Sequence, residues 1–368
     1  ETLRTIRPLL FTALGEPAKR RYLLLFQNNT ELRPTGGFIG SYALIDVLRG
    51  KLVNVEIPGG GSYDLQGQLS EYVRAPQPLH LVNARWEFQD ANWFPDFPTS
   101  ARKVLWIYEK SGGPTVDGVI AINADFFQRL LGIIGSLSMD GYNTTLTADN
   151  FFSETQKKVE HDYDKKENKP KQFIADLFPK ALEQMGTRPE SAPALAGLLM
   201  DSLARRDIQV FLNNSTEQER LLPFGISGSI RPAPLDYQMI VSANVGGGKS
   251  NAVLVDSVTR ETIMRDDGRL EGHITLTREH KGIRGESFTG SRNSSYLRFY
   301  LPRGTTLLSA SGFRAPNPAD FEPAPARLHD DTLLNMIEGS PAIDPMTGMV
   351  VTHEFEKSVF GHWLVVEP

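Results

Sequence analysis

Polar residues that could bind an anion follow the first strongly apolar stretch of the sequence. RYLLLFQNNTELRPTGGFIGSYALIDV contains two predicted strands joined by the polar loop QNNTELRPTGG. Asn28, Asn29 and Arg33 supply hydrogen-bond donors, and the paired glycines let backbone amides come close to a ligand. Ligands of open α/β sheets bind beyond the carboxyl ends of strands, so the loop predicts a phosphate or sugar site. The alternative is a structural loop in which Arg33 pairs with Glu31 or another acid.

A second candidate site lies in DANWFPDFPTSAR, at residues 90–102. Asp90 and Asp96 could bind Mg²⁺ through carboxylate oxygens, and Arg102 could meet a phosphate. The aromatic residues between them could stack on a sugar ring. The alternative is a packed loop in which the aromatic residues are core and Asp96 caps the following helix.

A third candidate is the charged run VEHDYDKKENKPKQ, at residues 159–172. Lys169 and Lys171 precede a predicted helix, whose free amide groups can bind anions. Glu160 could orient one of the two lysines. The alternative is a solvated surface segment, which is the commoner role of such runs.

Composition limits the classes of function. The 368 residues carry a formal net charge of −5, which gives no basic field for nucleic acid. The chain has no cysteine, so disulfides and thiolate metal sites are excluded. No pair of its seven histidines has the spacing of a zinc site. VGGGKSN lacks the spacing of a phosphate-binding P-loop and is predicted to be a flexible hairpin.

The hydrophobic patterns predict an α/β region followed by an all-β region. Strands and helices alternate in the first part, which is typical of a central sheet covered by helices. The predicted strands are residues 21–27, 37–48, 51–57 and 116–122, and the predicted helices are residues 2–14, 99–110 and 125–134.

Residues 147–222 have helical periodicity and are predicted to be a helical insertion. From about residue 235 onward the sequence shows short alternating strands, which predicts a β-sandwich. The expected domains are an N-terminal helix at 1–20, an α/β domain at 21–232 and a β-sandwich domain at 233–368.

Several long motifs carry a resemblance to a known family. FQNNTELRPTGGFIGSY, DANWFPDFPTSA, DGVIAIN and PKQFIADLF resemble a bacterial family known only as domain of unknown function number four thousand and twelve. The first two-thirds of the chain also resemble, more distantly, the LytR-CpsA-Psr family. Its members are membrane-anchored extracellular phosphotransferases that move glycopolymers from a polyprenyl pyrophosphate carrier to peptidoglycan.

The second resemblance implies an α/β/α sandwich and a site for pyrophosphate and a divalent cation. Arg33 lies close to the family's loop arginine, and Lys169 and Lys171 fall near a later pair of arginines. Asn28 and Asn29 stand where the family has an aspartate and often an arginine. The aspartate that follows the loop arginine in the family has no counterpart here.

The expected function is therefore that of an extracellular, membrane-tethered cell-envelope protein. It would bind a phosphorylated or polyprenyl-linked glycan and could transfer it to a cell wall polymer, with Arg33 and Asp90 as catalytic residues. The sequence has no apolar run long enough to span a membrane, so the anchor is expected outside it. One alternative is a non-catalytic envelope module, and another is a glycan hydrolase that uses Asp90 and Asp96.

Overall fold

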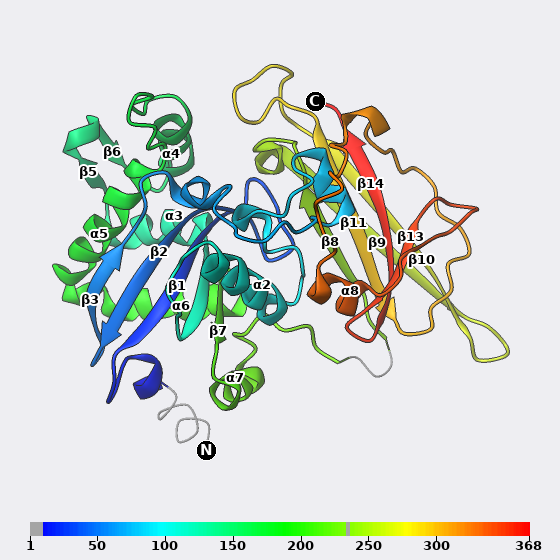
Figure 1. The fold of residues 1–368 in the computed structure, drawn as a ribbon, viewed down its shortest axis with the longest axis horizontal. Coiled ribbons are helices and arrows are strands. Elements are labelled where there is room, and N and C mark those ends of the chain that lie inside the picture. The colour runs from blue at the N-terminus through cyan, green and yellow to red at the C-terminus, as the bar shows by residue number, and fades with distance from the viewer. Residues whose placement is uncertain (1–9, 233–235) are drawn as a thin grey trace.

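Two β-sheet regions lie side by side in the computed structural model (Figure 1). The structure describes residues 10–232 and 236–368. Most of the helix predicted at 2–14 lies outside the described residues, and residues 10–13 of it are helical. The predicted boundary between 232 and 233 also borders undescribed residues.

The N-terminal sheet is mixed. Its strands β1 and β4 are parallel, and its other neighbours are antiparallel. In spatial order the strands are β3 (Lys51–Glu56), β2 (Phe38–Leu48), β1 (Arg20–Asn28), β4 (Gly118–Asn123) and β7 (Ile208–Leu212). The four strands predicted from hydrophobic runs in this region are confirmed to within about two residues. Arg49 and Gly50 both adopt positive φ, the geometry of a primed hairpin turn, where β2 reverses into β3.

Helices cover both faces of this sheet. They are α2 (Phe97–Lys110), α3 (Ala124–Ile134), α4 (Phe151–Glu160), α5 (Gln172–Gly186), α6 (Ala192–Ala204) and α7 (Ser215–Leu221). Two short strands, β5 (Leu137–Met139) and β6 (Thr144–Leu146), pair between α3 and α4.

Successive residues of β1 point to opposite faces of the sheet, as the pleat requires. Leu23 belongs to the core that includes Val104 of α2, while Leu24 belongs to the core that includes Phe178 of α5. An apolar run without alternation is therefore the expected sequence of β1, because both of its faces are buried.

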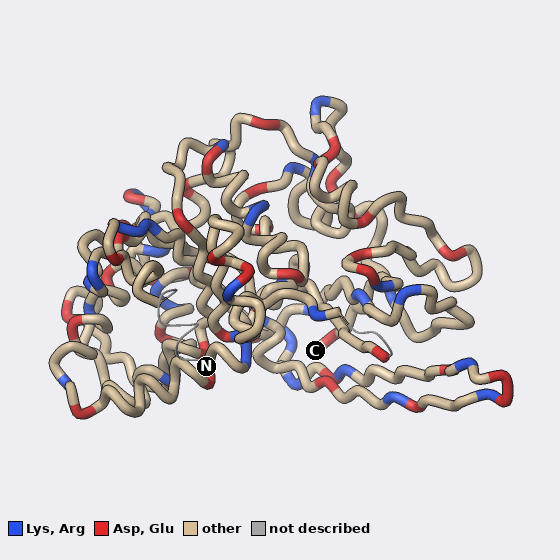
Figure 2. Tube along the Cα trace, turned by 90° about the horizontal axis from the view of Figure 1, so that it is seen from below, with Lys and Arg blue, Asp and Glu red and all other residues tan. Residues whose placement is uncertain are grey.

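The C-terminal sheet is antiparallel throughout. In spatial order its strands are β12 (Ala342–Ile343), β13 (Val350–Glu354), β14 (Lys357–Val366), β11 (Asn293–Pro302) and β8 (Met239–Asn244). A separate hairpin of β9 (Leu254–Met264) and β10 (Leu270–His280) packs Ile274 and Leu276 against this sheet. The hairpin projects beyond the sheet, and its turn is rich in charged residues (Figure 2). The second layer of the predicted sandwich is thus a hairpin rather than a full sheet.

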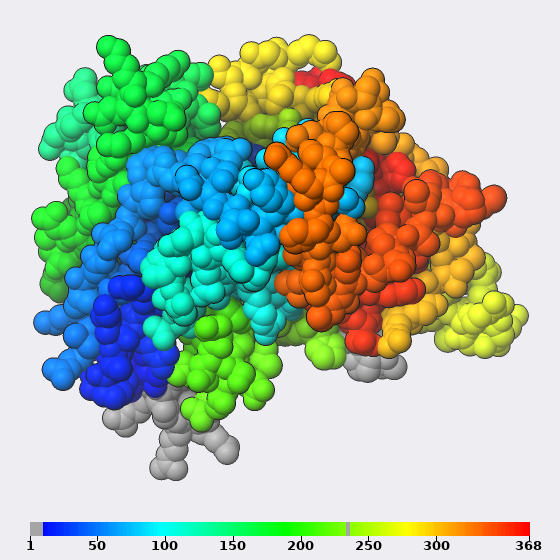
Figure 3. Space-filling model, in the orientation of Figure 1, coloured from blue at the N-terminus to red at the C-terminus, as the bar shows by residue number. Residues whose placement is uncertain are grey.

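The two sheet regions share one hydrophobic core. The ring of Trp93, from the segment before α2, stacks on Tyr296 of β11 with the ring centroids 6.1 Å apart. Val245 and Trp363 of the C-terminal region belong to the same core as Leu23 of β1. Figure 3 shows the segment around α8 (Thr332–Glu338) lying against the blue and cyan segment that leads to α2.

A buried polar cluster fixes α8 at this junction. The guanidinium of Arg298 donates to the carbonyl of Trp93 at 2.6 Å and pairs with Glu354 at 3.3 Å. The indole nitrogen of Trp93 donates to Glu338 at 2.8 Å. Burial, assisted by the nearby charge of Glu354, raises the pKa of Glu338 to about 7.

The free energy of unfolding is expected to fall as the pH rises from about 4.5 to about 7. The pKa of Glu338 is higher in the folded protein than its ordinary value of 4.5, so the folded state holds the extra proton in this range. Glu338→Gln keeps an acceptor for Trp93 and should flatten this part of the profile. Urea unfolding of both proteins at several pH values measures the effect. An unchanged slope in the variant would assign the pH dependence to another group.

Candidate functional site

A cavity of about 500 Å³ lies between the N-terminal sheet and helices α3, α4 and α5. Its volume is within the range of about 300–1,000 Å³ typical of small-molecule sites. The chain contributes to it from distant segments, since β1, β2, the loop after β3, α3–α5 and a loop after β8 all supply lining residues.

Part of the cavity wall is aromatic. Phe26 at the end of β1 contacts Phe127 of α3 and Phe178 of α5, with ring centroids 5.7 Å and 5.3 Å apart. Phe151 of α4 extends this group by stacking on Phe127 at 6.4 Å. These rings offer an apolar surface to a ligand.

Among the described residues, four charged side chains line the cavity: Asp64, Glu160, Lys171 and Lys249. Lys171 is 9% exposed, and its ammonium forms no hydrogen bond or ion pair with any residue in the described parts of the chain. Burial lowers the pKa of Lys171, and the negative charge of Glu160 opposes that shift. A buried ammonium without a partner is costly, so this site is suited to an anion.

The loop after β3 places the Lys171 side chain. The amide of Lys171 donates to the carbonyl of Gly59 at 2.7 Å. Gly61 adopts a φ of +67°, and a Cβ atom there would lie 2.6 Å from Cγ of Lys171. The glycines of PGGGS therefore let the lysine stem pass close to the loop backbone.

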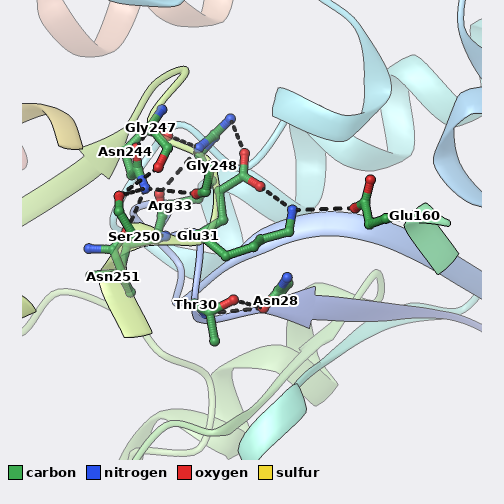
Figure 4. Close-up of polar contacts among 12 residues, drawn as sticks. Asn28, Thr30, Glu31, Arg33, Glu160, Asn244, Gly247, Gly248, Ser250 and Asn251 are labelled. Atoms are coloured by element: carbon green, nitrogen blue, oxygen red, sulfur yellow. Dashed lines mark hydrogen bonds and ion pairs between the residues drawn. The ribbon is translucent and has the colours of Figure 1, made fainter. Parts of the chain in front are cut away.

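Lys249 brings a second ammonium to the cavity. It pairs with Glu31 at 2.6 Å and, more loosely, with Glu160 at 3.9 Å. Figure 4 shows Glu160, Glu31 and Arg33 along this row of contacts. Lys249 belongs to VGGGKSN, which the structure folds as a turn followed by a short 3₁₀ helix, Ser250–Val253, rather than as the predicted hairpin. Sequence reasoning missed this residue, although a lysine directly after three glycines was the available signal.

Several buried side-chain oxygens of residues that line the cavity have no hydrogen-bond partner among the described residues. They are Oε1 of Gln27, Oγ of Ser41, Oγ1 of Thr155 and Oε1 of Gln156. The two amide oxygens can only accept hydrogen bonds, while the hydroxyls can donate or accept. All four atoms are themselves buried, so each carries the desolvation cost of an unmade hydrogen bond.

The structure brings Arg33 and Asp90 together, but away from this cavity. The guanidinium of Arg33 donates through Nε and Nη2 to Oδ1 of Asp90 at 3.1 Å and 3.0 Å. It also pairs with Glu31 at 3.5 Å and donates to the carbonyl of Asn244. Burial raises the pKa of Asp90, and the charge of Arg33 opposes that shift. Arg33 therefore pairs with acidic side chains, as the alternative of a structural loop predicted.

Asp96 caps a helix. Its Oδ2 accepts from the amide and the hydroxyl of Thr99 at 3.1 Å and 2.6 Å, and its Oδ1 accepts from the amide of Ile230 at 2.9 Å. Helix α2 accordingly begins at Phe97, two residues before the predicted start. Trp93 and Phe97 lie in the hydrophobic core, as the alternative for this loop predicted.

The predicted magnesium site does not fit these contacts. The carboxylate of Asp90 is paired with Arg33, and the carboxylate of Asp96 caps α2. In residues 10–232 and 236–368 no group of three or more acidic or histidine side chains could hold a metal ion.

The remaining predicted residues are dispersed. Asn28 lines the cavity, and its side-chain oxygen accepts from Thr30. The side-chain oxygen of Asn29 is buried without a hydrogen-bond partner in residues 10–232 or 236–368, and Asn29 is not part of the cavity lining. Arg102 lies over the ring of Phe211, at 5.4 Å, in a second cavity of about 420 Å³.

The two predicted lysines have different surroundings. Lys169 is exposed and pairs with Glu167 at 3.4 Å, whereas Lys171 points into the cavity. Of the predicted binding residues, the cavity thus unites Asn28 and Lys171.

The N-terminal region is an α/β fold with an internal cavity whose wall is partly aromatic. A common hydrophobic core joins this region to the antiparallel C-terminal sheet. Over residues 18–159 the chain matches the family described as "Protein of unknown function (DUF4012)". Lys171 and Lys249 lie beyond the matched range. No curated protein matches the chain.

Among solved structures, the chain is similar to the Lin1025 protein from Listeria innocua. The two are 11% identical, and the alignment covers 70% of this chain and 92% of that one with a TM-score of 0.28. None of the helices in the described part of the chain has the length and apolar character needed to cross a membrane.

Proposed function

We propose that this protein binds an amphiphilic ligand consisting of an apolar chain and a phosphorylated head, such as a polyprenyl-linked glycan. The apolar chain would lie against the aromatic wall of the cavity, and the phosphate would meet the ammonium of Lys171.

The observation that carries the proposal is the ammonium of Lys171, which has no ion-pair partner in the described part of the chain and lies in a cavity with a partly aromatic wall. Buried charges in proteins are normally paired, because the desolvation of a lone charge is unfavourable. A phosphate supplies the missing counter-charge and several strong acceptors. A neutral lipid would leave the ammonium without a partner.

The proposal is binding rather than transfer. Arg33 and Asp90, the residues expected to do chemistry, neutralise each other in a buried ion pair. Hydrolysis by Asp90 and Asp96 also lacks support, because both carboxylates have structural partners. A non-catalytic carrier or sensor of the lipid-linked glycan is consistent with these contacts.

The proposed location is the outer face of a bacterial membrane. Support comes from the resemblance to the LytR-CpsA-Psr family, whose members handle polyprenyl-linked glycans at that face. A central mixed sheet with helices on both faces is consistent with the α/β/α arrangement of that family.

Calorimetric titration with farnesyl phosphate tests the proposal. Farnesol serves as a probe for the prenyl chain alone, and inorganic phosphate serves as a probe for the phosphate group alone. Farnesyl phosphate is expected to bind at least about tenfold more tightly than farnesol, because one charge-assisted hydrogen bond contributes about 1.5–3 kcal/mol. Equal affinity for the two, or no heat with either at millimolar concentration, would contradict it and favour a purely structural module.

A further inference from the structure

We propose that Lys249 is the second cation of the headgroup site, and that it exchanges its contact with Glu160 for a phosphate oxygen when the ligand binds. This inference rests on the proposed function. It makes the binding site composite, because the lysine comes from the loop between β8 and β9 and the rest of the cavity comes from the N-terminal region.

The two ion pairs of Lys249 differ in strength. The pair with Glu31 is short, at 2.6 Å, and that carboxylate is held in turn by Arg33 at 3.5 Å. The contact with Glu160 is 3.9 Å long, and the side chain of Glu160 is 39% exposed. An arriving phosphate can therefore replace Glu160 while Glu31 keeps the ammonium in place.

The loop that presents Lys249 is ordered by specific contacts. A Cβ atom on Gly247 would lie 2.3 Å from Oδ1 of Asn244, and Gly248 adopts a φ of +54°. The amide of Lys249 donates to the carbonyl of Phe288 at 2.9 Å. These constraints fix the backbone from which the lysine reaches the cavity.

The same loop is bonded to the polar loop after β1. The amide of Asn244 donates to the carbonyl of Leu32 at 2.9 Å, and the amide of Asn251 donates to the carbonyl of Thr30 at 3.1 Å. The side chain of Asn251 also accepts from the amide of Leu32 at 3.1 Å. A ligand that contacts Lys249 therefore contacts a segment that is hydrogen-bonded to the loop after β1. The amides of residues 244–251 should exchange their hydrogens more slowly when the ligand binds.

Glu160 has the opposite effect on the ligand from the two lysines. Its carboxylate attracts Lys249 in the unliganded protein, and its charge opposes the lowering of the Lys171 pKa that burial causes. It would also repel a phosphate bound between them. Removing its charge should strengthen binding, an outcome that local misfolding would not produce.

The test compares affinities for farnesyl phosphate in the wild type, Lys249→Met and Glu160→Gln. Lys249→Met should weaken binding about tenfold, and Glu160→Gln should strengthen it about fivefold. Lys281→Met is the matched control, because that lysine is exposed, pairs with Glu279 and lies outside the cavity lining. It should bind like the wild type.

Hydrogen exchange provides an independent measurement. The ligand should slow exchange of the amides at 244–251 in the wild type and have little effect there in Lys249→Met. Wild-type affinity in Lys249→Met, or weaker binding in Glu160→Gln, would overturn the role of Lys249 while leaving the proposed function intact. Absence of binding in the wild type would overturn both.

Discussion

Lys171→Met is expected to abolish ligand binding and to stabilise the protein at the same time. Methionine has a similar length and no charge, so it removes a buried ammonium that lacks a partner in the described residues. The free energy of unfolding should rise by about 1–3 kcal/mol, since the desolvation cost disappears. Affinity for farnesyl phosphate should fall about 100-fold or more, because the buried phosphate would lose the closer of its two counter-charges and keep only Lys249, which Glu31 already pairs. Urea unfolding and calorimetric titration measure the two effects.

Lys169→Met is the matched control for this change. It removes the same charge two residues earlier, from a side chain that is 55% exposed and pairs with Glu167. Both stability and affinity should stay close to those of the wild type, because exposed ion pairs contribute about 0–1 kcal/mol. Equal losses of affinity in the two variants would mean that net charge near α5, rather than the buried ammonium, attracts the ligand.

Arg33→Met is expected to give the largest loss of stability. The substitution leaves the Asp90 carboxylate buried without its guanidinium, and such a change typically costs about 3–5 kcal/mol. It also removes the donor to the carbonyl of Asn244, which joins the two sheet regions. Urea unfolding should show a much lower midpoint than for the wild type.

The double variant Arg33→Met with Asp90→Leu separates a structural role from a functional one. Removing both charges avoids an unpaired buried ion, so most of the lost stability should return. Binding of farnesyl phosphate should weaken much less than in Lys171→Met, because neither residue lines the cavity and Arg33 acts on the site only through Glu31, the partner of Lys249. A stable double variant that no longer binds would instead support the functional role that the sequence first suggested for Arg33.

The sequence was sufficient for features that depend on local pattern. The buried strand β1 follows from an apolar run, and the helix cap at Asp96 was one of two alternatives for its loop. Local pattern does not determine the first residue of α2, because Pro98 and Thr99 are both compatible with positions just inside or just outside the helix.

The site itself depends on contacts that no local pattern contains. Arg33 and Asp90 are separated by 57 residues, and Lys249 and Glu31 by 218. Whether an arginine is free to bind a ligand depends on whether the fold brings an acidic side chain into contact with it. For the same reason the sequence does not distinguish Lys169 from Lys171, although the turn before α5 leaves the first exposed and directs the second into the cavity.

A crystal structure of the complex with farnesyl phosphate tests the central claim most directly. The account predicts a phosphate oxygen within about 2.7–3.2 Å of Nζ of Lys171, with the prenyl chain against Phe26 and Phe178. A phosphate bound elsewhere, with the Lys171 ammonium still unpaired, would contradict it.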